Sequence, residues 1–406
     1  MSRFDAIGQL EPPFYLVDLE RLRARHAAIH EAFRSRFDRV VLGYSYKTNY
    51  LPCVLRTLHA QGAWAEVVSD LEFALALRLG VPGSQIVYNG PIKSDESIAR
   101  ALGLGSLLHV DSLEEASRVA EQVRSLGLEG ARVGLRVNVP HPEGEGHRRF
   151  SRFGLTMKDL ERAAEMLAVV GSPPVGLHAH LATKARSLEH FEGLTAAIGE
   201  AAKRVDPEHL EWIDVGGGFG FTPEGFPGRD YPSFGEYAER IHATLASVHP
   251  ALVEKTLVIE PGMAMVNDAV RFVTRVESVK HVGGRRIAFV DGSIHTVKPT
   301  RHAMNLPTRV FDAAGREKRG DESPCDLVGY TCMDDDYIAI DQALPPLDPG
   351  DRVEIANVGA YTLVFKPPFI RARPAVYAQD GDRLTEDLPE ESFEAFFADF
   401  DLEPAR

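Results

Sequence analysis

Three reactive side chains in this sequence stand where short apolar segments end. Lys47, His180 and Glu260 each close or directly follow such a segment, and a glycine-rich stretch, residues 216–220, follows another. A lysine amine in a cleft, where burial lowers its pKa, can form a Schiff base with an aldehyde. Backbone N–H groups that glycines leave open can bind a phosphate. The four features together indicate a binding site at one rim of the fold.

Each feature alone also has an ordinary structural explanation. A single lysine is usually a solvated surface charge, and glycines also serve tight turns. A histidine can be a hydrogen-bonded core residue, and a glutamate can cap a helix or pair with a cation. In combination, a lysine for the aldehyde, glycine amides for the phosphate, an imidazole for the ring face and a carboxylate for the ring nitrogen match pyridoxal 5'-phosphate. No metal site is expected, because no other His, Cys or carboxylate pair completes the short His178-Ala179-His180 segment.

Eight apolar runs recur along the first two thirds of the chain, with polar or helical stretches between them. They cover residues 39–46, 64–68, 85–89, 106–110, 132–138, 174–180, 210–215 and 256–260. Several are rich in β-branched residues, as in parallel strands buried on both faces. Helical period follows in 70–79, 112–126 and 157–170, the second with Ser112 and Glu115 spaced as a capping box. The α/β pattern favours a closed (β/α)8 barrel of TIM type over an open doubly wound sheet, with the active site at the carboxyl ends of the strands.

Beyond about residue 270 the pattern changes to short strand-like segments separated by turn residues. Helical period is scarce there, which predicts a second, mostly antiparallel β domain. Only residues 392–400 are expected to be helical in this part, and the early strand at 13–19 is expected to join it. The predicted domains are a cofactor-binding barrel over residues 30–272 and a β domain formed by residues 1–29 and 273–406.

The composition excludes several classes of protein. The chain has 406 residues, of which 44% are hydrophobic and 26% charged, as in ordinary globular enzymes. Its 45 basic and 59 acidic residues give a net charge of −14, which argues against nucleic-acid and anionic-membrane partners. No apolar run approaches the roughly 18 residues of a membrane span, and the first residues do not resemble a signal peptide. Cys53, Cys325 and Cys332 form neither a disulfide framework nor a CxxC site, so a cytoplasmic protein is expected.

The sequence resembles the fold-type III pyridoxal-phosphate decarboxylases, the ornithine and diaminopimelate decarboxylase family, whose fold is like that of alanine racemase. Matching motifs occur in the family's order: YSYKTN (44–49), GLHAHLAT (176–183), DVGGGFG (214–220), EPG (260–262), GYTC (329–332) and NVGAYT (357–362). EPG alone would be common, but an ordered set that spans the chain is specific. The resemblance implies pyridoxal phosphate as cofactor and release of CO2 from Cα of an amino acid. It also implies a homodimer in which a cysteine of one subunit enters the active site of the other.

The resemblance assigns a role to each motif residue. Lys47 would carry the cofactor, His180 would stack on its ring, and Glu260 would contact the pyridine nitrogen. Thr183 stands where a phosphate-binding serine is usual, and Tyr361 would also reach the phosphate. Four glycines of the loop would complete the phosphate site: Gly216, Gly217, Gly218 and Gly220.

The predicted reaction has competing interpretations. In a decarboxylase, Cys332 would return a proton to Cα as the general acid. A racemase of the same fold typically places an arginine at the ring nitrogen and a tyrosine as second base, and Glu260 and Cys332 argue against it. A silent homologue that only binds partners would have lost cofactor residues, whereas Lys47, His180, Glu260 and Tyr361 are all present. A decarboxylase is therefore favoured.

Departures from the family pattern fall where its members bind the distal end of the substrate. Met263 follows EPG where an arginine is common, and Met333 replaces the usual acid after the cysteine. Other charged residues are further candidates for substrate contacts: Arg136, His295, Lys298, Arg301, Asp334, Asp335 and Asp336. We expect a substrate other than plain ornithine or lysine, either with a distal carboxylate or with a larger acyl or conjugated group. In the competing interpretation, Asp334 or Asp335 binds a distal amine.

Overall fold

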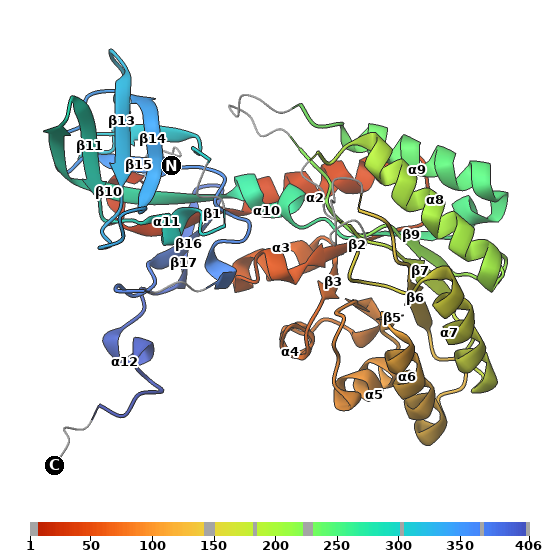
Figure 1. Cartoon of the computed structure of the whole chain (residues 1–406). Coiled ribbons are helices and arrows are strands. Elements are labelled where there is room, and N and C mark those ends of the chain that lie inside the picture. Colours follow the sequence, from red (N-terminus) through yellow and green to blue (C-terminus); the bar gives the residue numbers. More distant parts are fainter. Residues whose placement is uncertain are drawn as a thin grey trace.

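The computed structural model describes residues 7–141, 151–181, 185–221, 230–300, 304–365 and 369–402. Eight parallel strands form a closed barrel, which confirms the predicted fold (Figure 1). They are β2 (Val40–Ser45), β3 (Trp64–Val67), β4 (Ile86–Tyr88), β5 (Leu107–Val110), β6 (Val133–Arg136), β7 (Gly176–His178), β8 (Trp212–Asp214) and β9 (Thr256–Ile259). The barrel closes where β2 pairs with β9. Each predicted apolar run contains one of these strands.

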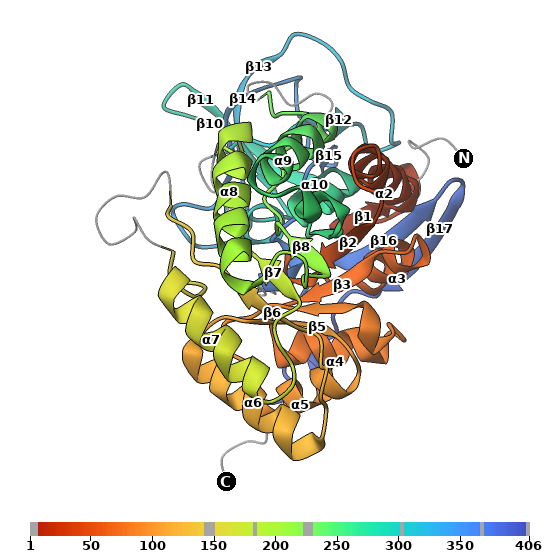
Figure 2. The same cartoon turned by 90° about the vertical axis from the view of Figure 1, so that its right-hand side faces the viewer.

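Helices alternate with the strands and cover the outside of the barrel (Figure 2). They are α2 (Leu19–Arg34), α3 (Pro52–Ala60), α4 (Asp70–Arg78), α5 (Asp95–Gly103), α6 (Leu113–Leu126), α7 (Met157–Val169), α8 (Leu188–Val205) and α9 (Phe234–Val248). Apolar side chains at helical spacing, such as Phe191, Leu194 and Ile198 of α8, are buried. Among the helices that the structure describes, none is both long and apolar enough to cross a membrane.

The start of α6 differs from the predicted capping box. The Ser112 side chain accepts a hydrogen bond from the N–H of Glu115 at 3.1 Å, as expected. The Glu115 carboxylate, however, accepts hydrogen bonds from the N–H of Asp111 at 2.7 Å and from the ammonium of Lys93 at 2.8 Å. Lys93 is buried and requires a charged partner inside the protein, which draws the Glu115 side chain away from the cap.

The second domain is a nine-stranded, mostly antiparallel sheet, as predicted. Its strands are β1 (Phe14–Asp18), β10 (Val270–Val282), β11 (Arg285–Val290), β12 (Thr308–Phe311), β13 (Ser323–Val328), β14 (Tyr337–Leu344), β15 (Arg352–Ile355), β16 (Ala375–Asp380) and β17 (Arg383–Leu388). The main spatial order is β14-β13-β11-β10-β1-β16-β17, and β15 pairs with β10 and β12. Strand β1 pairs antiparallel with β10 and parallel with β16, so the early strand lies in this sheet.

Two elements run across the predicted domain boundaries. Helix α2 contains residue 30 and strand β10 contains residue 272, and both lead from the barrel toward the sheet (Figure 1). The domain bounds therefore stay a prediction. The expected helix over 392–400 is shorter than predicted, because α12 covers only Phe393–Phe396. It buries none of its residues, and a short helix without a buried face gains little from tertiary packing.

Short helices complete the fold, and a loop of the β domain lies against the barrel mouth. The short helices are η1 (Tyr46–Thr48), η2 (Gly83–Gln85), η4 (Pro250–Glu254), α10 (Met263–Val266), η5 (Asn267–Ala269), α11 (Ile294–Val297) and η6 (Leu363–Phe365). The Asn49 side chain donates a hydrogen bond to the Gly359 carbonyl at 2.9 Å. The N–H of Tyr361 donates to the Thr48 carbonyl at 3.0 Å. These bonds place residues 359–361 beside the turn that carries Lys47.

Candidate active site

Lys47 lies in the short helix η1, directly after strand β2, at the carboxyl end of the barrel. Its Nζ lies 2.6 Å from Glu66 Oε2, and its side chain, which is 35% exposed, lines a cavity. Burial acts to lower the pKa of Lys47, but the carboxylates of Glu66 and Glu260 outweigh this effect and raise it. The sequence-based expectation of a lowered pKa is therefore wrong for the lysine in this arrangement.

Glu66 was not among the site residues predicted from the sequence. Glu66 is buried in strand β3, and its carboxylate also accepts hydrogen bonds from Ser45 Oγ and from Asn89 Nδ2. The Asn89 amide donates to Glu260 as well, and so connects the two carboxylates that face Lys47. A charged residue within the apolar run 64–68 was the signal that could have identified Glu66, because a buried carboxylate needs partners.

His180 is held by the glycine-rich loop. The N–H of Gly217 donates a hydrogen bond to His180 Nδ1 at 2.9 Å, which requires this nitrogen to accept. Burial, reinforced by the charge of Lys47, lowers the pKa of His180 to about 3. The imidazole is therefore neutral and fixed in orientation, as a ring that packs against a flat cofactor should be.

Glycines are required in this loop for steric reasons. A Cβ at Gly217 would lie 2.2 Å from the Glu260 carbonyl oxygen, and one at Gly216 would lie 2.6 Å from His180 Nδ1. Gly216 and Gly218 also have positive φ angles, of 64° and 91°. Gly220 is fixed through its N–H, which donates to Tyr237 Oη at 3.2 Å. The loop therefore brings backbone close to the cavity, as a phosphate cradle requires.

Glu260 belongs to a buried cluster with His178 and Asp214. Glu260 Oε2 lies 3.7 Å from His178 Nε2, and Asp214 Oδ1 accepts the N–H of Gly216 at 2.8 Å. Burial and the neighbouring Glu260 raise the pKa of Asp214 well above its usual value. Burial also acts to raise the pKa of Glu260, but His178 and Lys47 hold it well below its usual value. The cluster therefore favours a proton on Asp214 and the negative charge on Glu260.

The same cluster places two carboxylates beside His178 of the His178-Ala179-His180 segment. This grouping was not predicted from the sequence. Ligand atoms of His178, Asp214 and Glu260 lie within 4.8 Å of one another. Among the residues that the structure describes, this is the only group with the spacing of a metal site. The raised pKa of Asp214 disfavours a second negative charge there, and the expectation of no metal stays a prediction.

A small cavity lies where these groups meet. It is lined by Ser45, Lys47, Thr48, His180, Arg186, Gly217, Gly218, Phe219, Glu260, Gly262, Met263 and Tyr361. Tyr361 enters from the β domain with a positive φ of 55°, which is uncommon for a residue with a side chain. The structure thus brings six of the predicted site residues to one cavity, and it adds Arg186, which the sequence analysis missed because its reach to the glycine loop is not a local pattern.

Other predicted site residues lie elsewhere in the single chain. Cys332 is exposed on the β domain, as are Asp334 and Asp335. Asp336, in contrast, is buried, and its carboxylate accepts hydrogen bonds from the N–H of Ile294 and from the N–H and hydroxyl of Thr331. Asp336 therefore holds a loop of its own chain.

The basic candidates also make contacts within the chain. His295 Nε2 lies 3.3 Å from Met333 Sδ. Lys298 is buried and donates to the Met304 carbonyl. Arg136 pairs with Asp111 at 3.1 Å. Two further predicted residues fall outside the described part of the chain: Thr183 and Arg301.

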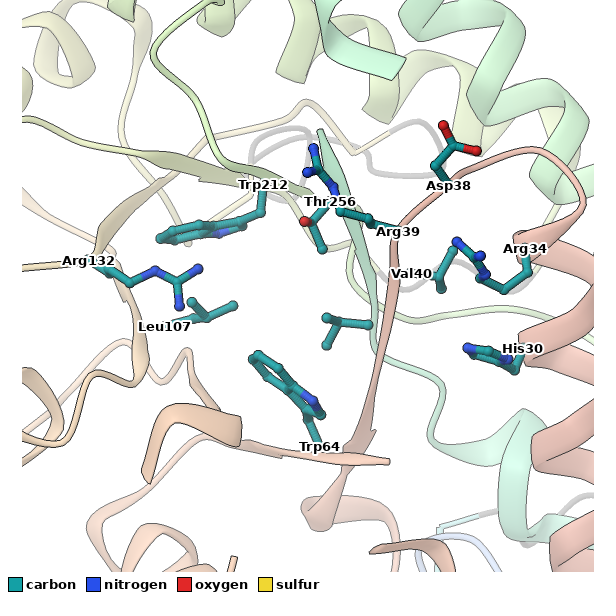
Figure 3. A pocket seen from close by; sticks show the side chains of 11 residues that line it. His30, Arg34, Asp38, Arg39, Val40, Trp64, Leu107, Arg132, Trp212 and Thr256 are labelled. Atoms are coloured by element: carbon teal, nitrogen blue, oxygen red, sulfur yellow. The ribbon is translucent and has the colours of Figure 1, made fainter. Parts of the chain in front are cut away.

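A larger pocket of about 390 Å³ lies at the opposite end of the barrel (Figure 3). It is lined in part by the first residues of five strands: Val40, Trp64, Leu107, Trp212 and Thr256. None of the predicted site residues lines it. In barrels of this type the carboxyl ends of the strands carry the chemistry. The smaller cavity at Lys47 is therefore the candidate active site.

The residues around that cavity fit pyridoxal phosphate. Lys47 offers an amine for the aldehyde, the glycine loop offers open backbone for the phosphate, and His180 and Glu260 offer an imidazole and an anionic carboxylate for the ring. A parallel barrel with this set at its mouth and an attached β sheet defines a pyridoxal-phosphate enzyme of the barrel type.

Comparison with known proteins agrees with this class. A family model described as "Pyridoxal-dependent decarboxylase, pyridoxal binding domain" matches residues 19–267. The chain belongs to this family of pyridoxal-phosphate-dependent decarboxylases, and the resemblance seen in the sequence is confirmed.

Named relatives and a solved structure extend over most of the chain. The diaminopimelate decarboxylase of Methanothermobacter thermautotrophicus is 30% identical over 376 residues, which are 89% of this chain and 85% of the relative. That of Helicobacter pylori is 30% identical over 361 residues, which are 86% of this chain and 85% of the relative. The crystal structure of a diaminopimelate decarboxylase from Helicobacter pylori complexed with L-lysine superposes with a TM-score of 0.84 at 26% identity and covers 97% of this chain and 98% of that one. The chain is accordingly an amino-acid carboxy-lyase that uses pyridoxal phosphate.

Proposed function

We propose that Lys47, His180 and Glu260 form the catalytic centre of this decarboxylase, and that its substrate carries a distal carboxylate, as diaminopimelate does. The observation that carries the first part is the anionic Glu260 beside the cavity that Lys47 and His180 also line. The second part is supported by relatives named for diaminopimelate.

The catalytic roles follow from charge and contact. Pyridoxal phosphate, when bound, accepts the electron pair that remains on Cα after CO2 departs. Glu260, held anionic by its neighbours, stabilises a proton on the ring nitrogen and so favours this acceptance. The neutral His180 would pack against the ring without adding a positive charge that opposes that proton. Lys47 supplies the amine that binds the aldehyde, and backbone N–H groups of the glycine loop bind the phosphate.

The residues near the predicted distal end favour a carboxylate over an amine. A distal amine needs an accessible acid. Asp336 does not offer one, because it is buried and its carboxylate already accepts hydrogen bonds from Ile294 and Thr331. Met333 offers no charge, and its sulfur lies against the His295 imidazole, which can donate to a carboxylate. Asp334 and Asp335 remain exposed, and they are the residues on which the competing interpretation depends.

The substrate is tested by measuring CO2 release from a matched panel. The panel contains meso-diaminopimelate, L-lysine, L-ornithine and L-glutamate, each assayed for kcat/KM with the same enzyme preparation. We expect meso-diaminopimelate to give the highest value, because its distal end has a carboxylate next to the amine, whereas lysine and ornithine have the amine alone. Lysine or ornithine as the best substrate would contradict the distal-carboxylate part and leave the decarboxylase itself intact.

The second proposal is a homodimer with shared active sites. Cys332, the candidate acid for Cα, is exposed and does not line the cavity of its own chain. The large apolar side chains of Phe369 and Ile370, on the same domain, are 48% and 55% exposed, and the Phe369 ring centroid lies 6.0 Å from that of His295. A second copy of the chain that covers these side chains would bring Cys332 to a neighbouring cavity. Analytical ultracentrifugation is expected to give about twice the chain mass.

A further inference from the structure

Arg186 is the second cationic side chain, after Lys47, among the described residues that line the candidate active-site cavity. It lies just before α8, and its guanidinium reaches the glycine loop. Arg186 Nη1 donates hydrogen bonds to the carbonyls of Phe219 at 2.9 Å and Gly218 at 3.3 Å. Arg186 Nη2 lies 3.6 Å from the sulfur of Met263, which lines the same cavity.

The backbone of Arg186 is tied to the same loop. Tyr237 Oη donates to the Arg186 carbonyl at 2.5 Å, and it accepts the N–H of Gly220 at 3.2 Å. Arg186 also has a positive φ of 49°, a conformation that costs free energy for a residue with a side chain. Both ends of Arg186 are thus fixed relative to residues 218–220, so its guanidinium is positioned before any ligand arrives.

The charge balance at this end of the cavity favours a cation. A phosphate ester carries about −1.5 to −2 charges at neutral pH, and backbone N–H groups alone supply no net charge. Lys47 lies beside Glu66 and Glu260, which already offset its charge. A guanidinium offers planar, charge-assisted hydrogen bonds to phosphate oxygens, and Arg186 presents one at the glycine loop.

We propose that Arg186 binds the phosphate of the cofactor and is a phosphate-positioning residue of this site. The proposal rests on the proposed assignment of the glycine loop to the phosphate. Arg186 acts as one preformed unit with Gly218 and Tyr237, and it sets the affinity for the phosphate ester and not the chemistry at Cα.

The test measures binding of pyridoxal phosphate and of pyridoxal, which lacks the phosphate, to the cofactor-free full-length protein. Visible absorbance titration gives both Kd values for the wild type and for Arg186→Met. We expect Arg186→Met to weaken pyridoxal phosphate by about 10- to 100-fold, the range of a charge-assisted hydrogen bond, and to change pyridoxal by less than about 3-fold. Arg204→Met, a change in an exposed ion pair with Glu161, is the matched control and should change neither value.

Two further variants keep the test decisive if Arg186→Met folds poorly. Arg186→Lys retains the charge and should bind pyridoxal phosphate with an intermediate Kd. Adding Met263→Arg to Arg186→Met should recover most of the lost affinity, because the side chain of residue 263 lies beside the position of the Arg186 guanidinium. Inorganic phosphate should raise the melting temperature of wild-type cofactor-free protein and not that of Arg186→Met.

Two results would overturn the proposal. Equal losses for pyridoxal phosphate and pyridoxal would show that Arg186 acts on the ring or on folding. An unchanged cofactor Kd with a raised KM would assign the guanidinium to the substrate carboxylate. Failure of the wild-type protein to bind pyridoxal phosphate would instead contradict the proposed site as a whole, so the two failures are distinguishable.

Discussion

Lys47 Nζ lies 2.6 Å from Glu66 Oε2, and this contact ties the amine that is to bind the cofactor to a buried carboxylate. The pair raises the pKa of Lys47 against the opposing effect of burial. An ammonium cannot attack an aldehyde, so Glu66 affects how fast the amine becomes available. Glu66 is therefore a positioning residue with a measurable electrostatic effect.

Glu66→Gln is expected to lower the pKa of Lys47, because the amide keeps its size and loses its charge. The rate of cofactor attachment to cofactor-free protein should then rise at a given pH, by about 10-fold for each unit that the pKa falls. Stopped-flow visible absorbance over a series of pH values measures this profile. Glu161→Gln, on the outside of the barrel, is the control. An identical pH profile in wild type and Glu66→Gln would show that the pair does not limit attachment.

The raised pKa of Glu72 predicts that the stability of the protein depends on pH. Burial, reinforced by the charge of Glu66, raises the pKa of Glu72 to about 7 from its usual 4.5. The folded state therefore binds more protons than the unfolded state between these values, and stability falls as pH rises from about 4.5 to about 7. The full loss, present above about pH 7, is about 3 kcal/mol.

Glu72→Gln should remove this dependence while keeping an acceptor for the N–H of Val68. The cofactor-free variant is expected to melt several degrees above wild type at about pH 7.5 and at the same temperature at about pH 5. Differential scanning calorimetry at both pH values measures the difference. A constant offset at both would assign the effect to packing and not to titration.

The close backbone approach at Gly217 predicts that a side chain at this position would displace the glycine loop. A Cβ there would lie 2.2 Å from the Glu260 carbonyl oxygen, so Gly217→Ala must displace one backbone segment from the other. We expect cofactor affinity to fall by at least about 10-fold, which corresponds to about 1.4 kcal/mol. Gly193→Ala is the control, because it lies in α8 and a Cβ there meets nothing within 4 Å. If both variants bind the cofactor like wild type, the close approach at Gly217 is not needed.

Substitutions of Glu260 and Asp214 are predicted to differ in their effect on kcat, although both residues are buried acids of one cluster. Because burial and Glu260 raise the pKa of Asp214 and so favour its neutral form, Asp214→Asn should preserve that neutral form and the acceptor for the N–H of Gly216. Glu260→Gln removes the anion that would stabilise a proton on the ring nitrogen. Steady-state assays should show kcat reduced by about 100-fold or more in Glu260→Gln and by less than about 5-fold in Asp214→Asn, in line with the loss of a charged contact to the reacting system. The reverse order would move the catalytic charge to Asp214.

The barrel could be predicted because its strands are short and buried on both faces. Residues of β9 such as Leu257, Val258 and Ile259 are all buried, so the apolar run itself marks the strand. Lys47 and Glu260 lie within two residues of strand ends, and strand ends of a parallel barrel share one rim. These residues could thus be placed together from local patterns alone.

Contacts that depend on the register between two strands could not be predicted from local sequence patterns. Glu66 pairs with Ser45 across β2 and β3, and that register is fixed by packing over the whole barrel. Arg186 reaches Phe219 through a loop conformation with a positive φ, which no residue type marks in advance. The Ser112 and Glu115 spacing predicted a reciprocal cap, but the need of the buried Lys93 for a partner outweighed the local rule.

The exposed position of Cys332 predicts that mixed dimers recover activity if active sites are shared as proposed. Cys332 is exposed on its own chain, whereas Lys47 lines the cavity, so each site of the proposed dimer would take one residue from each subunit. Lys47→Ala and Cys332→Ala should each be nearly inactive alone. After dissociation and reassociation of an equal mixture, half of the dimers should be mixed, and one of their two sites should have both native residues. Decarboxylase assays are then expected to recover about a quarter of wild-type activity, as the symmetry of a two-fold dimer requires. A mixture of Lys47→Ala with Glu260→Gln, whose residues line one cavity, is the control and should recover nothing. Recovery in neither mixture, with subunit exchange verified by a mass-tagged chain, would place Cys332 outside the shared site.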